Sequence, residues 1–224
     1  MTEDFAAELA RMALELHDQP DVDQTAQRVL DFVPRTIGCD QAGIVLANRG
    51  RLRAVAASGP ESAAVDQYQV RVGDGPATVA VEQSASVRVD DTEADGQWPA
   101  WSRLAAAHGL RSALSVRLYT LGSTIGALTL YDAKPSRFGP EQEAVAHVLA
   151  HHASVALSSA RNEETLWEAI DARKEIGQAQ GMLMERFALS ADQSFDVLRR
   201  YSQAHNVKLR EVAQRLISTR RLPG

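Results

Sequence analysis

One long helical stretch constrains this fold more than any other feature of the sequence. It begins at Pro140 and meets no strong helix breaker before Phe187, and only Gly177 and Gly181 weaken it. We interpret it as a signalling helix that packs on a preceding β-rich domain at its start and against a second copy of the chain further along. The sequence therefore predicts a homodimer.

Apolar residues on this stretch partly follow the 3.5-residue spacing of a coiled coil. They are Val145, Val148, Leu149, Val155, Leu166 and Ile170. Polar residues interrupt the seam at His152, Ser159 and Asn162. The pattern therefore indicates a packed helix rather than a strong coiled coil.

The residues before Pro140 mix helical and β-rich patterns. The predicted helices span 5–16, 22–37, 76–82 and 98–108. The predicted strands span 42–47, 52–58, 68–72, 86–91, 112–120 and 124–132, the last two joined as a hairpin. This order predicts an α+β domain.

Two short helices close the chain after the long one. Ser190 and Gln193 fit a capping box at the start of the first. The second has an apolar face made of Leu209, Val212, Ala213, Leu216 and Ile217. With the end of the long helix, they predict a three-helix module.

Charge divides the chain unevenly. Residues 1–171 contain 14 Lys and Arg against 24 Asp and Glu, whereas residues 172–224 contain 10 against 5. The first part is therefore acidic and the last part is basic. This asymmetry indicates two modules with different partners, of which only the last suits a polyanion.

The expected cellular location rests on features that the sequence lacks. No apolar run approaches the roughly 20 residues that span a bilayer, and the first residues lack the order of a signal peptide. Cys39 is the only cysteine, so no intramolecular disulfide can form. We expect a cytoplasmic protein in which Cys39 is a small apolar residue rather than a sensor thiol.

Patterns that would indicate an enzyme are weak. Glu143, His147 and His151 share one helix face at i, i+4 and i+8, which permits a metal but does not diagnose one. The acidic residues between Asp90 and Asp95 lack calcium-loop spacing, and the turn at 73–76 has no following basic residue. We therefore expect no catalytic residues and no metal site, and no cofactor can be named.

A small-molecule pocket is one of two interpretations of an aromatic cluster. Trp98 and Trp101 in one loop and helix could wall a pocket with Arg88, Arg111 and Tyr131. Tryptophan also fills protein cores. The two interpretations stand about even.

The basic residues of the last module indicate a nucleic-acid surface. If the apolar face of the final helix points inward, Lys208, Arg210, Arg215 and Arg220 point to solvent. From the long helix, Arg173, Gln180 and Arg186 can supplement them. Such groups can hold phosphates and stack on or bond RNA bases. Charge alone would also fit a solvated surface, with Arg210 near Gln214.

The C-terminal segment resembles a known family. The runs AIDARKEIGQAQGMLMERF, LSADQSFDVLRRYS and NVKLREVAQRLI, between about 166 and 222, resemble the ANTAR domain of bacterial transcription antitermination regulators. Gln180 departs from this pattern, because many members carry Lys before the glycine. An amide there lacks a phosphate-attracting charge but can still bond a base edge.

The region from about 22 to 160 resembles a GAF domain. The resemblance is carried by GDGPATVAVEQ, SVRVDD and the hairpin that continues to residue 142. It implies an antiparallel sheet flanked by helices. Domains of this family bind cyclic nucleotides, haem, bilins, small metabolites or nothing identifiable, so a small-molecule ligand in this domain is possible but the resemblance does not name one. We therefore expect a GAF-like sensor domain over 1–160 and an ANTAR-like three-helix domain over 161–224.

Together the resemblances imply a mechanism. Two ANTAR modules of a dimer would bind paired stem-loops in nascent RNA and stabilise them against a terminator. The competing hypothesis is a ligand- or redox-sensing dimer whose terminal helices dock a partner protein.

Overall fold

The computed structural model describes residues 3–17, 19, 21–48, 50–83 and 86–220. The chain divides into two compact units, Met1–Asn162 and Glu163–Gly224. Among the described residues, no helix is both long and apolar enough to cross a membrane.

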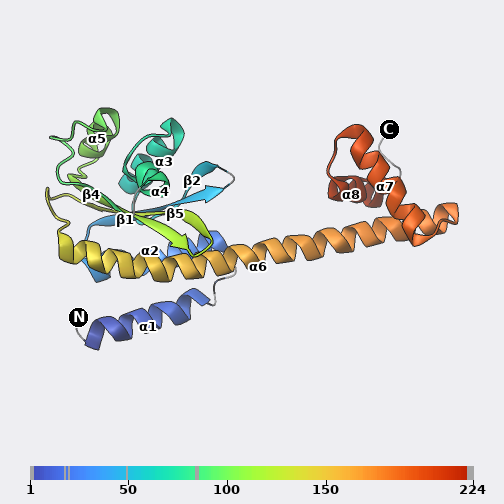
Figure 1. The fold of residues 1–224 in the computed structure, drawn as a ribbon, viewed down its shortest axis with the longest axis horizontal. Helices are drawn as coiled ribbons and strands as arrows, with labels where there is room; N and C mark the ends of the chain where they lie inside the picture. The colour runs from blue at the N-terminus through green and yellow to red at the C-terminus, as the bar shows by residue number, and fades with distance from the viewer. Residues whose placement is uncertain (1–2, 18, 20, 49, 84–85, 221–224) are drawn as a thin grey trace. The chain divides into compact units, whose positions relative to one another are not determined.

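A five-stranded antiparallel sheet forms the centre of the first unit (Figure 1). Its strands are β1 Gln41–Asn48, β2 Arg51–Ala57, β3 Ser86–Val89, β4 Ser112–Thr120 and β5 Ser123–Asp132. They lie in the order β2-β1-β5-β4-β3, so β1 and β5 pair although they are far apart in the sequence. This confirms the expected antiparallel sheet, in which the predicted hairpin is β4 and β5.

Helices cover both faces of this sheet (Figure 1). α2 Val22–Ile37 and the first part of α6 Pro140–Phe187 lie on one face, with α1 Glu3–His17 packed on α2. α3 Pro60–Val72, α4 Pro76–Glu82 and α5 Pro99–Ala107 lie on the other. The period-2 alternation of a strand sends Ile44 toward α2 and α6 and Val45 toward α4.

Capping residues define both ends of α2. The Asp21 carboxylate accepts a hydrogen bond from the Gln24 amide at 2.7 Å and caps the first turn. Gly38 ends the helix in the left-handed conformation, with φ of 75°. The buried face of α2 includes Val29, Leu30 and Val33, as its periodicity predicted.

The predicted strand over residues 68–72 is wrong, because these residues form the last turns of α3. β-branched and aromatic residues gave the run a strand-like composition. However, Gly59 and Pro60 start a helix upstream, and this helix buries Ser62, Val65, Asp66 and Gln69 on one face. Because most of the buried residues of α3 are polar, the periodicity of apolar residues did not reveal this helix.

The second unit contains the last part of α6, α7 Ala191–His205 and α8 Leu209–Thr219. Its core consists of Ala179, Leu183, Leu198, Val212, Ala213 and Leu216. The predicted capping box is present, because Ser190 and Gln193 each accept a hydrogen bond from the other's amide. Asn206 ends α7 in the left-handed conformation, which lets the chain turn into α8.

Candidate nucleic-acid interface

Three of the predicted RNA-contacting residues are exposed cations. Arg173 lies on α6, Lys208 immediately precedes α8, and Arg215 lies on α8. Lys208 and Arg215 are seven residues apart, so they lie on the same side of the helix, beside the face that buries Val212 and Leu216. A phosphate chain can approach this face without displacing protein contacts.

Arg210 differs from the expectation that it points freely to solvent. Its Nε donates to the Glu175 carboxylate at 2.7 Å, and Gln214 donates to the same carboxylate at 3.1 Å. These hydrogen bonds, the one from Arg210 first, lower the pKa of Glu175. The three residues therefore connect α8 to α6, and Arg210 offers less unpaired charge to a polyanion than Lys208 or Arg215.

Gln180, Arg186 and Arg220 also make protein contacts. The Gln180 amide donates to the Ala191 carbonyl at 3.1 Å, which joins α6 to the first turn of α7. Arg186 donates through Nη1 to the Arg220 carbonyl at 2.8 Å. Arg220 has φ of 57° and ends α8, so the bond from Arg186 satisfies a carbonyl at a helix terminus.

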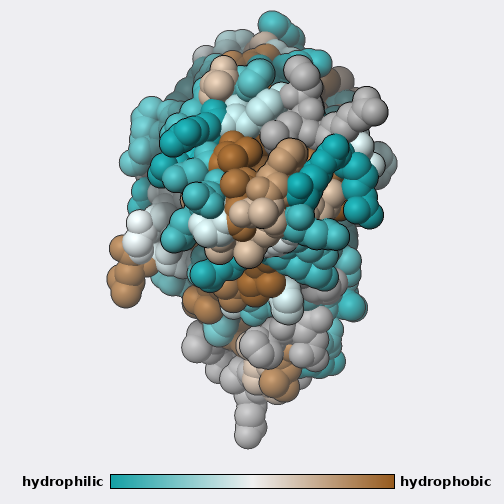
Figure 2. Space-filling view, turned by 90° about the vertical axis from the view of Figure 1, so that its right-hand side faces the viewer, coloured by the Kyte–Doolittle hydropathy of each residue, from teal (hydrophilic) through white to brown (hydrophobic). Residues whose placement is uncertain are grey.

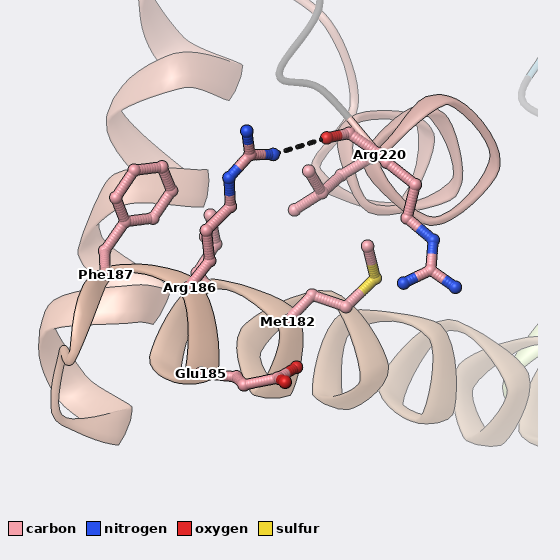
Figure 3. Close-up of a pocket in the computed structure, with 7 residues that line it drawn as sticks. Met182, Glu185, Arg186, Phe187 and Arg220 are labelled. Carbon is pink, nitrogen blue, oxygen red and sulfur yellow. Dashed lines mark hydrogen bonds between the residues drawn. The ribbon is translucent and has the colours of Figure 1, made fainter.

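A pocket of about 460 Å³ opens between the end of α6 and α8 (Figure 3). Met182, Leu183 and Leu216 contribute apolar surface to it. The remaining lining residues are Glu185, Arg186, Phe187 and Arg220. Sequence reasoning identified the two arginines but missed Glu185 and Phe187, because only the packing of α8 on α6 brings them to one site.

Large apolar side chains also lie exposed on this unit. They include Leu166, Trp167, Ile170, Met184 and Phe187. Figure 2 shows apolar side chains among hydrophilic ones on the face of the molecule that it draws. Leu166, Trp167 and Ile170 lie on about one turn of α6, and exposed apolar side chains grouped in this way are typical of an interaction site.

In the first unit, three of the five predicted ligand residues pack into the core. Trp98 and Trp101 are 4% and 2% exposed, and their rings meet edge to face at 6.4 Å. Tyr131 joins the same cluster. The structure therefore favours the core interpretation for this pair, although the buried Trp101 Nε1 has no hydrogen-bond partner among the described residues.

The two predicted arginines form ion pairs with carboxylates of the neighbouring loop. Arg88 sits between Val87 and Val89 on β3, and both valines pack toward the tryptophans, so Arg88 points to the opposite face. Arg88 pairs with Asp90 at 2.9 Å, and Arg111 pairs with Asp91 at 2.9 Å. Carboxylates hold both guanidinium groups.

The acidic loop before α5 is explained by the same contacts. Besides the pairs above, Glu93 lies 3.0 Å from the Arg111 guanidinium. Asp95 accepts hydrogen bonds from the Trp98 amide and the Ser102 hydroxyl, which fixes the start of α5. These carboxylates therefore have structural partners within the first unit.

A buried polar network that the sequence did not reveal lies beneath α3. The Tyr131 hydroxyl and the Gln69 amide both donate to Asp66 Oδ1, at 2.6 and 2.7 Å. Asp66 Oδ2 has no partner among the described residues and faces Gly43, where a Cβ would lie only 1.8 Å away. Burial raises the pKa of Asp66 to about 7, against the lowering effect of its two hydrogen bonds.

The remaining candidate groups have ordinary structural roles. Burial raises the pKa of the Cys39 thiol to about 12, and the negative charge of Asp132 adds to this effect. His151 packs edge to face on Tyr119 at 5.1 Å, and His147 lies 3.9 Å from Glu143. Among the described residues, no three His, Cys, Asp or Glu side chains are placed to hold a metal ion.

The chain consists of two modules, a sheet domain and a small helical unit with exposed cations, which the long helix α6 joins. Family models give the same division: a GAF domain matches residues 19–158 and an ANTAR domain matches residues 164–217. The chain belongs to the GAF-domain family and carries a C-terminal ANTAR domain. The ANTAR domain implies an RNA-binding antitermination regulator, and the GAF domain implies a sensory module.

Solved structures support the fold of the first module. A GAF domain of a phosphoenolpyruvate-protein phosphotransferase from Coxiella burnetii is 17% identical with a TM-score of 0.58, covering 72% of this chain and 96% of its own. A free methionine-R-sulfoxide reductase from Neisseria meningitidis is 18% identical with a TM-score of 0.55, covering 73% of this chain and 95% of its own. At these identities the likeness establishes fold alone. No curated protein sequence matches the chain.

Proposed function

We propose that this protein is a signal-responsive antitermination regulator that binds paired stem-loops in nascent RNA as a homodimer. The observation that carries the proposal is the exposed cationic face of Lys208 and Arg215 on the ANTAR unit. Phosphate contacts supply much of the affinity of proteins for nucleic acids. We assign the sensory role to residues 1–160 and the RNA-binding role to residues 161–224.

The sensory role requires a small-molecule ligand in the first unit. Asp66, Gln69 and Tyr131 form an internal polar network there, and Asp66 lines a cavity of about 110 Å³ between α3 and β2. A ligand that bonds the unpartnered Asp66 oxygen would stabilise one arrangement of α3. We also propose that the protein is a cytoplasmic regulator rather than an enzyme, and the regulatory pairing of a GAF domain with an ANTAR domain supports this.

Homodimerisation is assigned to the exposed apolar turn of α6. Trp167 is 64% exposed and Leu166 is 60% exposed, so a second copy of the same turn would bury both. A Trp167→Glu substitution is expected to shift the protein from dimer to monomer in sedimentation velocity. A dimer that survives this substitution would place the interface elsewhere.

Titration with RNA tests the proposal. The full-length protein is expected to bind an RNA with two adjacent small hairpins more tightly than a scrambled RNA at physiological salt. A chain ending at Arg161 keeps the bond from Arg161 to the Ala47 carbonyl but lacks the ANTAR domain, so it should not bind. Equal affinity for both RNAs would refute stem-loop recognition.

The competing function, a sensor that docks a protein, draws its support from the same exposed apolar turn. Retention of one protein from RNase-treated lysate, together with no preference for hairpin RNA, would favour docking. The redox form of this alternative is disfavoured because Cys39 is buried and the pKa of its thiol is raised to about 12.

A further inference from the structure

The pocket between α6 and α8 combines features that suit one particular kind of occupant. Its volume of about 460 Å³ lies within the range of roughly 300–1,000 Å³ found for small-molecule sites. Its apolar surface comes from Met182, Leu183 and Leu216, whereas Arg186 and Arg220 supply positive charge. An occupant should therefore be flat or compact, partly apolar, and attached to negative groups.

We propose that this pocket receives one unpaired base from the loop of the bound RNA, an inference that rests on the proposed RNA-binding function. An unpaired base has apolar faces, polar edges and a phosphate on either side. Proteins that read single-stranded RNA commonly stack such bases on aromatic rings or arginine planes. The pocket offers both kinds of surface.

Phe187 provides the aromatic surface. Its side chain is 56% exposed, which is unusual for a phenylalanine that the core could have buried. The Arg186 guanidinium carbon lies 5.5 Å from the centre of this ring. Arg186 is also tied to the Arg220 carbonyl, so the guanidinium is already held in place before RNA arrives (Figure 3).

The charges around the pocket give it a preference among bases. Arg186 and Arg220 can bind the phosphates that flank the base. The Glu185 carboxylate is an acceptor only, so it favours a base edge that carries an N–H donor. Adenine, cytosine and guanine offer an exocyclic amino group to the carboxylate, whereas the N3–H donor of uracil lies between two carbonyl oxygens that a carboxylate repels.

A double-mutant cycle between protein and RNA tests the inference in the full-length chain. Each loop nucleotide of the two-hairpin RNA is made abasic in turn, and each RNA is titrated against wild type and Phe187→Leu. Leucine keeps apolar bulk but removes the ring, and the exposed position makes misfolding a small concern. At one loop position, removal of the base should weaken wild-type binding about 5- to 150-fold.

The same abasic RNA should bind Phe187→Leu no more weakly than the intact RNA does, because the variant has already lost the stacking contact. Phe187→Trp should restore the sensitivity. Met184→Ala is the matched control, since Met184 is an exposed apolar residue of α6 outside the pocket lining. Glu185→Gln should reduce the discrimination against uracil at the sensitive position.

The outcomes separate this inference from the proposed function. If Phe187→Leu binds every RNA as wild type does, while Lys208→Ala/Arg215→Ala weakens binding, the base pocket is refuted and RNA recognition stands. If wild type shows no preference for hairpin RNA, both the base pocket and the proposed RNA-binding function are refuted. If Phe187→Leu loses a protein partner but keeps its RNA affinity, the pocket docks a protein and the inference is overturned.

Discussion

The sensor unit and the ANTAR unit place their polar groups in opposite positions. In the sensor unit a carboxylate, a phenol and two indoles lie inside the protein, at Asp66, Tyr131, Trp98 and Trp101. In the ANTAR unit the core is small and apolar, and Arg173, Lys208 and Arg215 lie at the surface. Under the proposed function, a signal has to reach an enclosed network, whereas RNA meets a surface that is already formed.

Truncation of a core side chain should produce the largest difference in stability between the two units. Leu198→Ala in the ANTAR unit and Leu114→Ala in the sensor unit each remove a fully buried side chain, at a cost of about 2–5 kcal/mol. A core in a domain of fewer than about 70–80 residues supplies only about 3–5 kcal/mol. Leu198→Ala should therefore unfold the ANTAR unit at room temperature, whereas Leu114→Ala should leave both units folded.

Urea titration followed by circular dichroism and limited proteolysis would detect this difference. Leu198→Ala should lose helical signal and hairpin-RNA binding before any denaturant is added. Two variants with equal midpoints would mean that the units unfold together and that the small core does not stand alone.

Titration of Asp66 should give the sensor unit a pH dependence that the ANTAR unit lacks. The pKa is 3.8 for the ordinary group and about 7 in the folded protein, so the folded state holds the proton more strongly. The free energy of unfolding should therefore fall as pH rises from about 4 to about 7, by at most about 4 kcal/mol. Asp66→Asn should remove this fall.

Urea unfolding at pH 5 and pH 8, followed by tryptophan fluorescence, measures the difference between wild type and Asp66→Asn. Carboxylates with lowered pKa values, such as Asp91, oppose the trend in both proteins, so only the difference between the two is diagnostic. Parallel pH profiles would show that Asp66 is not protonated in the folded state near neutrality.

The reactivity of the Cys39 thiol tests whether groups inside the sensor unit are enclosed. The pKa of Cys39 rises from 9.0 to about 12, which lowers the thiolate fraction at pH 8 by about 1,000-fold. Reaction with a disulfide reagent should be slower by at least this factor in the native protein than in urea. Rapid native labelling would contradict the burial and revive redox sensing.

The smallest effect is expected at Glu211. It lies between Lys208 and Arg215 on the exposed face of α8, three and four residues from them. Glu211→Gln should tighten binding to hairpin RNA by about two- to fourfold, because one charge that repels phosphates is gone. Glu141→Gln, a first-turn carboxylate in the sensor unit, is the control and should not change affinity.

The sequence predicted the elements better than it predicted their contacts. Local signals such as Gly38 after the first buried helix and Ser190 with Gln193 before α7 mark helix ends, so these helices were predicted. Residues 68–72 were assigned to a strand because the polar buried face of α3 does not look apolar. The core role of Trp98 and Trp101 depends on which face of the sheet they meet, and local spacing does not specify this.

The sequence could predict which site residues are exposed only where charge and helix periodicity decide exposure. Lys208 and Arg215 follow from the periodicity of α8. The ion pair of Arg210 with Glu175 joins residues 35 positions apart, so no local sequence pattern predicts it. Phe187 and Glu185 become pocket residues only after α8 packs on α6.

The salt dependence of RNA affinity tests the central claim most directly. The slope of log affinity against log salt should be shallower for Lys208→Ala/Arg215→Ala than for wild type by about 1.4 to 1.8, because two phosphate contacts are lost. Arg51→Ala/Arg103→Ala removes two exposed cations from the sensor unit and should keep the wild-type slope. Equal slopes for all three proteins would show that this face of the ANTAR unit does not hold the RNA.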